Sequence, residues 1–365
     1  MYDSFFFFKG RVALYAILKA MGVGEGDEVI LPGFTCVVVP NAIIYLGAKP
    51  VYADIDPETY NIDCTKIEEK ITENTRAIIA QHTFGIPAEM DSITRIAKKY
   101  NLYVIEDSCH AWGSKYKGRD VGTFGDAAFF SSQWSKPLTT GLGGWAVLNN
   151  EELKADMEMI SPEFAAPSAR DVILLKSQYL AYSAFSAPSL FWIARGMYRK
   201  LSQLGLALGS SSDKELECEM PPAYAKRMSR WQKGLLERKL RDMSTSITHR
   251  KNVSTIYRHL FGKMGLKTCE LPAAYDPVFL RYPVLVDDKW RVLQEAQRQR
   301  IEMGDWFLSP VHPNTDGLEK ARYQRGSCPN AEKICHHIVN LPTHGRIGPE
   351  EARRVVDVIC GVRGY

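Results

Sequence analysis

Short apolar runs alternate with amphipathic segments along the first 150 residues. β-rich runs are expected at 28–32, 50–56, 76–83, 103–108, 126–132 and 144–148, and helical patterns at 10–21, 36–46 and 90–100 lie between many of them. Such alternation is typical of an α/β domain with a mostly parallel sheet. Ile78, Ile79, Val104 and Ile105 stand in near-continuous apolar runs, which predicts strands that are buried on both faces.

The rhythm changes after residue 150. Apolar helical patterns interrupted by prolines fill 151–220, a long polar helix is expected over 225–247, and the remainder mixes a strand near 277–286 with helices at 289–298 and 349–360. A chain of 365 residues exceeds the roughly 250–300 residues at which one core stops growing. We therefore predict a large domain of residues 1–248, with a helical insertion at about 160–215, and a smaller C-terminal α+β domain of residues 249–365.

Composition places the chain among ordinary globular proteins, with 45% hydrophobic and 24% charged residues. The net charge of +4 is too weak to indicate nucleic-acid binding. None of the eight cysteines forms a CxxC pair, so neither a zinc site nor a disulfide framework is expected, and no metal is predicted. The N-terminus lacks the features of a signal peptide, and a cytoplasmic location is the expectation.

The stretch from 103 to 144 carries the candidate chemistry. One apolar strand ends in Glu106 and Asp107, and the next is followed by Ser131 and, five residues later, Lys136, just before a glycine-rich turn. Acids at the carboxyl end of a parallel strand point into the crevice where α/β proteins bind ligands. Glycines let the backbone approach such a ligand closely.

An acid at one strand end and a lysine beside the next is the pair that pyridoxal phosphate (PLP) chemistry needs. The lysine holds the aldehyde as a Schiff base, and the carboxylate keeps the pyridine nitrogen protonated. Ser131 and the backbone N–H groups where Gly10 opens the first helix are suited to the phosphate, and Arg11 is suited to pair with it. Simpler explanations exist for isolated residues, since such a lysine is often solvated and such an aspartate often caps a helix.

Several long strings resemble the DegT/StrS family of PLP-dependent sugar aminotransferases, which have the fold-type I architecture. The strongest are residues 10–63, residues 75–100, and residues 104–150 with VIEDSCHAWGS and FFSSQWSKP; residues 224–234 and 328–355 match more loosely. The resemblance implies an α/β fold with a mostly parallel central sheet in the large domain, PLP as the cofactor, and transaminase activity.

The resemblance also assigns residues. Lys136 falls on the family's Schiff-base lysine, Asp107 on the carboxylate that pairs with the pyridine nitrogen, and His110 on a Gln or His beside the ring. Ser131 falls on a phosphate-binding serine and Gly10 on the glycine of the family's helix start. The cofactor-binding set implied is thus Lys136, Asp107, His110, Ser131 and Gly10, together with Arg11 and Cys36.

Four positions depart from the family pattern. Arg11 stands where a threonine is usual, Cys36 where an aromatic ring usually stacks on the cofactor, and Gln133 where a His or another aromatic is frequent. Ala225 stands where an asparagine usually reaches the partner subunit. Cys36 and Ala225 keep open an alternative, a catalytically silent relative that binds PLP or a sugar for regulation or scaffolding.

The activity implied is transfer of an amino group from an amino acid, glutamate or glutamine, to a keto sugar, free or linked to a nucleotide or lipid. Lys136 argues against the related dehydratases, which carry histidine there. A Rossmann dehydrogenase is disfavoured because the cluster at 22–26 follows a helix and Asp27 replaces the last fingerprint glycine. The resemblance implies a homodimer, for which Tyr224, Lys226 and Arg227 are the local candidates to reach across.

One segment is not explained by the resemblance. Residues 177–194 carry no charge, and residues 188–208 form an amphipathic pattern with cations opposite its apolar stripe. A basic amphipathic helix can lie in a membrane interface, which would place the protein at the inner membrane face and favour a lipid-linked acceptor. Packing of the stripe on the protein's own core or on the dimer mate is the favoured expectation.

Overall fold

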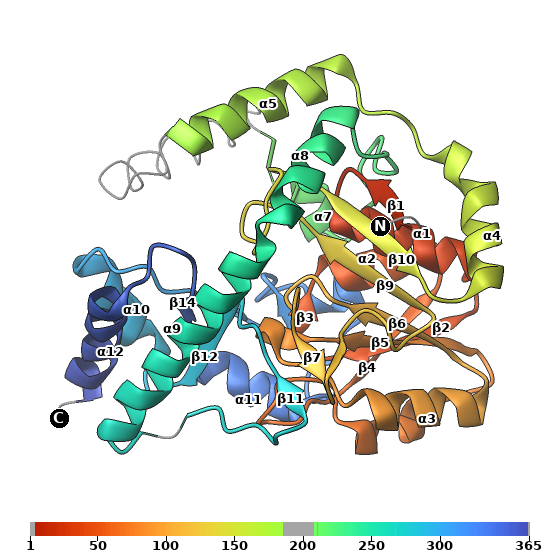
Figure 1. Ribbon diagram of the computed structural model, residues 1–365. Coiled ribbons are helices and arrows are strands. Elements are labelled where there is room, and N and C mark those ends of the chain that lie inside the picture. Colours follow the sequence, from red (N-terminus) through yellow and green to blue (C-terminus); the bar gives the residue numbers. More distant parts are fainter. Residues whose placement is uncertain (1–3, 185–207, 210, 267, 364–365) are drawn as a thin grey trace.

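The computed structural model of the protein describes residues 4–184, 208–209, 211–266 and 268–363. Its large sheet has seven strands (Figure 1), namely β1 (Ser4–Phe7), β2 (Glu28–Pro32), β4 (Lys49–Ala53), β5 (Thr75–Gln81), β6 (Tyr103–Asp107), β9 (Ala127–Ser131) and β10 (Gly144–Leu148). The spatial order is β1-β10-β9-β6-β5-β2-β4. Within this sheet β10 alone runs opposite to the other strands, because it pairs antiparallel with both β1 and β9. Strands β9, β6, β5, β2 and β4 pair in parallel.

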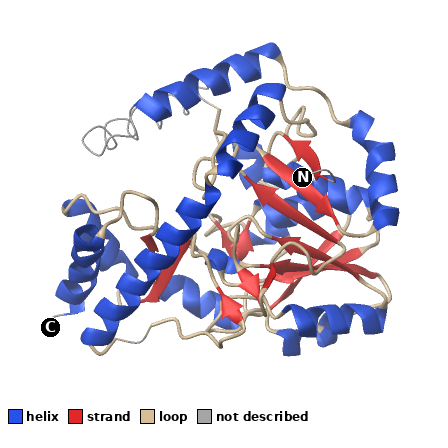
Figure 2. Cartoon of the chain, in the orientation of Figure 1, coloured by secondary structure: helices blue, strands red, loops and turns tan. Residues whose placement is uncertain are grey.

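Helices cover this sheet and make up much of the other described residues (Figure 2). They are α1 (Gly10–Ala20), α2 (Val38–Ile44), α3 (Met90–Tyr100), α4 (Glu151–Ile160), α5 (Ala169–Ala184), α7 (Asp213–Leu216), α8 (Arg230–Arg241), α9 (Met243–Lys263), α10 (Lys289–Arg298), α11 (Pro329–His337) and α12 (Pro349–Arg363). The short strands are β3 (Thr35–Cys36), β7 (Lys115–Tyr116), β8 (Arg119–Asp120), β11 (Tyr275–Asp276), β12 (Arg281–Leu285), β13 (Val311–His312) and β14 (Ile338–Pro342).

Both faces of the sheet are buried, which explains the continuous apolar runs of its strands. On β5, Ile79 belongs to the core that contains Leu14 and Ile17 of α1. Its neighbour Ile78 points to the other face, into the core formed with Ile93 of α3. Successive strand residues alternate between faces, so a strand packed between α1 and α3 needs apolar side chains at consecutive positions.

The C-terminal part is a smaller arrangement in which β12 pairs with β14 in antiparallel fashion. α9 runs diagonally past this pair of strands and packs on α12, as Figure 1 shows. The expected helices at 289–298 and 349–360 are confirmed as α10 and α12, the latter three residues longer. The predicted division between residues 248 and 249 falls inside α9 and remains a prediction.

The expectation of one helix over 225–247 is wrong. Ser229 caps α8 through a capping box in which its hydroxyl accepts from the Gln232 N–H and the Gln232 side chain accepts from the Ser229 N–H. This cap satisfies free N–H groups of the first turn and starts the helix at Arg230. α8 then ends at Arg241, and after the single residue Asp242 the chain continues as the longer α9.

Most of the segment 188–208 lies outside the described residues. Its last residue, Leu208, is described and packs against the small core of Phe8, Leu142 and Leu175. Among the described residues, none of the helices combines the length and the apolar character that crossing a membrane requires. α5, which precedes the segment, extends along the edge of the molecule in Figure 1.

Candidate active site

One cavity of about 530 Å³ lies at the carboxyl edge of the large sheet. Gln81, Asp107 and Ser131 are the last residues of β5, β6 and β9, which are adjacent and parallel, so their side chains meet at that edge. The N-terminus of α1, residues 209 and 211–216, and residues 306–313 complete the wall. All seven residues selected from the sequence line this cavity: Gly10, Arg11, Cys36, Asp107, His110, Ser131 and Lys136.

A second, larger cavity of about 660 Å³ lies between residues 57–60 and the C-terminal part. It contains none of the seven residues and therefore lacks both Lys136 and Asp107. Size alone therefore does not select the site, and the chemistry of the lining residues favours the smaller cavity.

Asp107 is buried at the end of β6, and its Oδ1 accepts a hydrogen bond from the Cys109 N–H at 3.0 Å. Burial raises the pKa of this carboxyl group, while the Cys109 N–H and the positive charge of Lys136 oppose the rise. A carboxylate in this setting gains stability from any cation brought into the cavity beside it.

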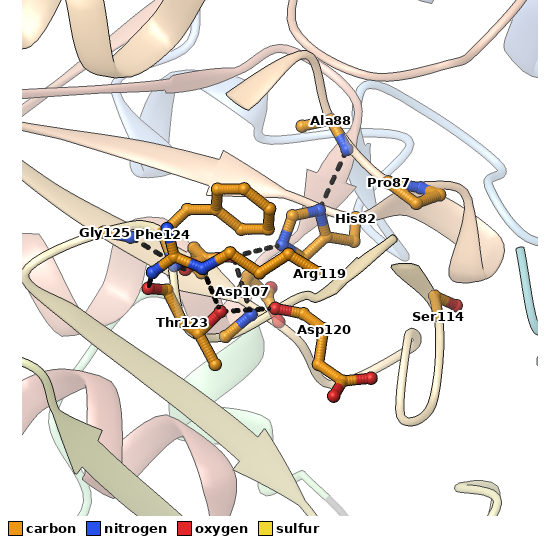
Figure 3. Close-up of polar contacts among 12 residues, drawn as sticks. His82, Pro87, Ala88, Asp107, Ser114, Arg119, Asp120, Thr123, Phe124 and Gly125 are labelled. Atoms are coloured by element: carbon orange, nitrogen blue, oxygen red, sulfur yellow. Dashed lines mark hydrogen bonds and ion pairs between the residues drawn. The ribbon is translucent and has the colours of Figure 1, made fainter. Parts of the chain in front are cut away.

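The neighbouring Glu106 lies on the opposite face of β6 from Asp107 and is held by backbone N–H groups and by His82, whose bond to Ala88 is drawn in Figure 3. Its carboxylate accepts hydrogen bonds from the N–H groups of Gly122, Phe124 and Gly125 at 2.7, 2.6 and 2.8 Å. His82 Nε2 lies 3.0 Å from the same carboxylate, and His82 Nδ1 accepts from the Ala88 N–H at 2.9 Å. The proton of a neutral His82 ring is therefore on Nε2, which donates to Glu106. Glu106 is thus a structural acid.

Lys136 follows β9 in a turn in which its N–H donates to the Gln133 carbonyl at 2.9 Å. Burial lowers the pKa of its amine, and the negative charge of Asp107 partly offsets the effect. The Nζ atom lies 5.5 Å from the centre of the Trp306 ring. Because burial disfavours the ammonium form, the neutral, nucleophilic amine is available at a lower pH than for a solvated lysine.

Gly10 makes a close approach that no other residue fits. A Cβ atom there would lie 2.9 Å from Ser131 Cβ and 3.2 Å from the Phe130 carbonyl oxygen. A Cβ on Gly144 would lie 2.3 Å from Gly10 Cα. The first turn of α1, whose leading N–H groups lack intrahelical partners, is thereby set against Ser131 at the cavity wall. This arrangement suits an anionic group such as a phosphate.

Arg11 has a partner within the chain that the sequence did not indicate. Its Nη1 donates to Glu215 Oε1 at 2.6 Å and to Ser211 Oγ at 3.1 Å, and Lys9 Nζ lies 3.3 Å from Glu215 Oε2. Burial opposes the ionisation of Glu215, but the charges of Arg11 and Lys9 outweigh it and lower its pKa. Burial and the charge of Arg11 lower the pKa of Lys9 to about 8. Arg11 thus ties residues 211–216 to α1, and a contact with phosphate remains a prediction.

Aromatic rings form the opposite wall. His110 stacks on Trp306 with ring centres 5.4 Å apart and an interplanar angle of 13°. Burial, aided by the charges of Lys136 and Arg281, holds the pKa of His110 well below its usual value, so its ring is neutral. The segment containing Trp306 reaches Cys36 because β13 pairs with β3, which sets His312 opposite Cys36.

Trp306, Phe307 and His312 were not selected from the sequence. They lie about 170 residues after Lys136, in a stretch without a helix or strand pattern that would place them at the sheet edge. Paired prolines around His312, at 310 and 313, mark a fixed turn but do not show what it faces.

A mostly parallel sheet of this topology, with a half-buried lysine and a buried aspartate at its carboxyl edge, defines a class of PLP-dependent enzymes. The model of the DegT/DnrJ/EryC1/StrS aminotransferase family matches residues 8–173 and 193–360, so the chain belongs to that family. The family consists of PLP-dependent sugar aminotransferases, and PLP is the cofactor of this fold. The expected fold and transaminase class are thereby confirmed.

Named relatives and solved structures agree. GDP-perosamine synthase of Escherichia coli O157:H7 is 49% identical over 144 residues, which cover 40% of this chain and 40% of the relative. UDP-N-acetyl-3-dehydro-alpha-D-glucosamine 3-aminotransferase of Acidithiobacillus ferrooxidans is 28% identical over 351 residues, 96% of this chain and 81% of the relative. A putative sugar aminotransferase of Streptococcus pneumoniae in its PLP form superposes with a TM-score of 0.75 at 21% identity, covering 98% of this chain and 86% of the other.

Proposed function

We propose that this protein moves an amino group from glutamate or glutamine to a keto sugar, in free or nucleotide-linked form. The observation that carries the proposal is the meeting of the Lys136 amine, the Asp107 carboxylate and the Gly10–Ser131 wall in one cavity. The names of the two relatives, GDP-perosamine synthase and a UDP-sugar aminotransferase, support a nucleotide-linked acceptor.

The residues present fit PLP, which when bound supplies an aldehyde that captures amines and a ring that accepts electrons. Lys136 would hold the cofactor covalently and, once released as a neutral amine, would take the proton from the α-carbon of the donor. Asp107 would hold the proton on the pyridine nitrogen by charge. Ser131 Oγ and the first N–H groups of α1 would hold the phosphate, and His110 would lie beside the ring.

The first half-reaction tests this proposal. Purified protein loaded with PLP is mixed with glutamate or glutamine in the absence of an acceptor, and the absorbance of the cofactor and the keto acid formed are followed. We expect one equivalent of keto acid per site. A protein that binds PLP but forms none would favour the alternative, a silent relative, for which Cys36 in place of an aromatic residue is the specific observation.

The proposal includes a homodimer with its sites near the subunit interface. Tyr224 and Lys226, expected to reach across, are engaged in their own chain: Tyr224 OH donates to the Arg11 carbonyl at 3.2 Å, and Lys226 Nζ lies 2.7 Å from Asp171. A contact of Tyr224, Lys226 or Arg227 with the partner subunit stays a prediction. A monomer by light scattering that still turns over would contradict the dimer.

Peripheral contact of residues 188–208 with the inner membrane face stays a prediction. Sedimentation with anionic liposomes tests it, with a Leu190, Trp192 and Met197 to Ser variant beside the wild type. Equal pelleting of the two proteins, or of neither, would remove the membrane contact.

A further inference from the structure

Trp306 presents a flat apolar surface beside the reacting amine. Its indole lines the cavity, lies parallel to the His110 ring and has its centre 5.5 Å from Lys136 Nζ. A group that reacts at Lys136 must therefore lie next to this indole. An indole covers the C–H face of a ring-shaped ligand through dispersion contacts and burial of apolar area.

The backbone that carries Trp306 is held by one buried side chain. The amide oxygen of Asn340 accepts from the Trp306 N–H at 3.2 Å, and its Nδ2 donates to the Trp306 carbonyl. The backbone of Asn340 also exchanges two hydrogen bonds with Gly304, at 2.8 and 3.0 Å. A Cβ on Gly304 would lie 2.4 Å from Asn340 Oδ1, so glycine is required for this contact. Asn340 of β14 thus fixes the backbone position of Trp306.

A guanidinium lies over the same indole. Arg281, the first residue of β12, has its Cζ 5.2 Å from the ring centre of Trp306. The amine of Lys136 and the guanidinium of Arg281 therefore lie 5.5 and 5.2 Å from the centre of the same indole. An arginine stacked on an aromatic plane keeps its N–H groups free at the edges of the fork for an anion.

Arg281 shares its carboxylate with other cations. Glu302 lies 3.6 Å from Arg281, 3.0 Å from His344 and 3.8 Å from Arg346. The Arg281 side chain is 19% exposed, so it is reachable from the solvent. Arg281 thus places a positive charge beside Trp306, which lines the cavity that holds Lys136.

We propose that Trp306 and Arg281 form the acceptor subsite, in which the indole packs against the sugar ring and the guanidinium binds a phosphate group that the acceptor carries. This rests on the proposed aminotransferase function. Arginine binds phosphate through two parallel N–H···O bonds. A sugar ring joined to a phosphate presents an apolar face and an anion side by side, and the Trp306 indole and the Arg281 guanidinium are neighbours in the same way. The subsite thereby selects a phosphorylated or nucleotide-linked sugar over a free one.

The test measures binding to the PLP-loaded protein by calorimetry. The probes are UDP-N-acetylglucosamine and GDP-mannose, with N-acetylglucosamine as the sugar without phosphate and glutarate as a stand-in for the donor. The variants are Arg281→Gln, Trp306→Leu and Trp306→Phe. Arg346→Gln is the matched control, because it removes an equal charge that also faces Glu302. Thermal unfolding verifies that each variant is folded.

We expect Arg281→Gln to weaken binding of the sugar nucleotide by about tenfold or more, the scale of one charge-assisted bidentate contact. Trp306→Leu should weaken it by about tenfold, with most of the affinity kept in Trp306→Phe. Glutarate binding and the half-reaction with glutamate should change less than about twofold in Arg281→Gln, and Arg346→Gln should resemble the wild type.

Three outcomes would overturn the proposal. In the first, the wild type binds neither sugar nucleotide, or binds N-acetylglucosamine equally well. In the second, Arg281→Gln weakens glutarate and slows the glutamate half-reaction while sparing the sugar nucleotide, which would assign the guanidinium to the donor's carboxylate. In the third, Arg346→Gln loses as much affinity as Arg281→Gln. Loss of the half-reaction in the wild type would instead reject the proposed function, and the binding data would still decide the subsite.

Discussion

The two walls of the active-site cavity are built in different ways. One consists of strand ends and the start of α1, contributed by residues 10–136 and held by the hydrogen bonds of a parallel sheet. The other consists of residues 211–216 and 306–313, which are held by side-chain contacts such as the Arg11–Glu215 ion pair and the Asn340–Trp306 bonds. The groups proposed to hold the cofactor therefore lie on the sheet and α1, while those proposed to face the substrate lie on segments outside the sheet.

The largest expected effect is the loss of the amine from the first wall. Lys136→Ala should reduce transamination by at least about 10³-fold, because covalent attachment and proton transfer are lost together. The half-reaction with glutamate measures this, with the exposed Lys117→Ala as the control. Borohydride reduction of the wild type should attach the cofactor to the peptide that contains Lys136. Attachment at any other lysine would refute the assignment.

Asp107→Asn should follow, with a loss of activity of about 10²-fold or more, because an amide cannot hold the pyridine proton by charge. The variant should keep its thermal stability, since burial already raises the pKa of this carboxyl and disfavours its charge. Steady-state kinetics and thermal unfolding together check the prediction. An Asp107→Asn enzyme with near-wild-type turnover would show that the first wall does not act as proposed.

Glu106→Gln sharpens the contrast between two neighbouring acids. Glu106 accepts three backbone N–H bonds and a bond from His82, so loss of its charge should destabilise the fold by about 3 kcal/mol, the upper end of the scale for hydrogen bonds to a charged group. Urea unfolding measures the change. The folded fraction should retain turnover. A variant of normal stability with impaired turnover would reverse the roles of Glu106 and Asp107.

The smallest expected effect is on stability, at the Glu302 ion pairs beside the second wall. Burial opposes the ionisation of Glu302, but His344, Arg281 and Arg346 outweigh it and lower its pKa to about 2. A carboxyl with a lowered folded-state pKa stabilises above its ordinary pKa of about 4.5 and loses that contribution as the pH falls toward 2. Glu302→Gln should therefore be less stable by about 1–2 kcal/mol at neutral pH, a value discounted for partial exposure. Urea unfolding from neutral to acid pH should show the difference shrinking, and a constant difference would contradict the ion-pair cluster.

The sequence predicted the large sheet closely because its strands leave a strong local signal. The runs at 28–32 and 144–148 coincide with β2 and β10, and the helix at 90–100 with α3. Burial on both faces demands consecutive apolar residues, and an amphipathic helix demands a 3.6-residue period. The same regularity put Asp107 and Ser131 at strand ends, and parallel pairing then brings both to one edge.

Other features needed the tertiary structure. Helix ends depend on a few capping contacts. The start of α8 at Arg230 was therefore missed, although its Ser229–Gln232 capping box was readable, and so was the change from α8 to α9 at Asp242. Whether Glu106 or Asp107 faces the cavity follows from strand orientation, which resemblance supplied and spacing did not. The partners of Arg11 and the position of Trp306 were not readable at all. Glu215 lies 204 residues from Arg11, and only the folded chain brings together side chains whose contact leaves no periodic trace along the sequence.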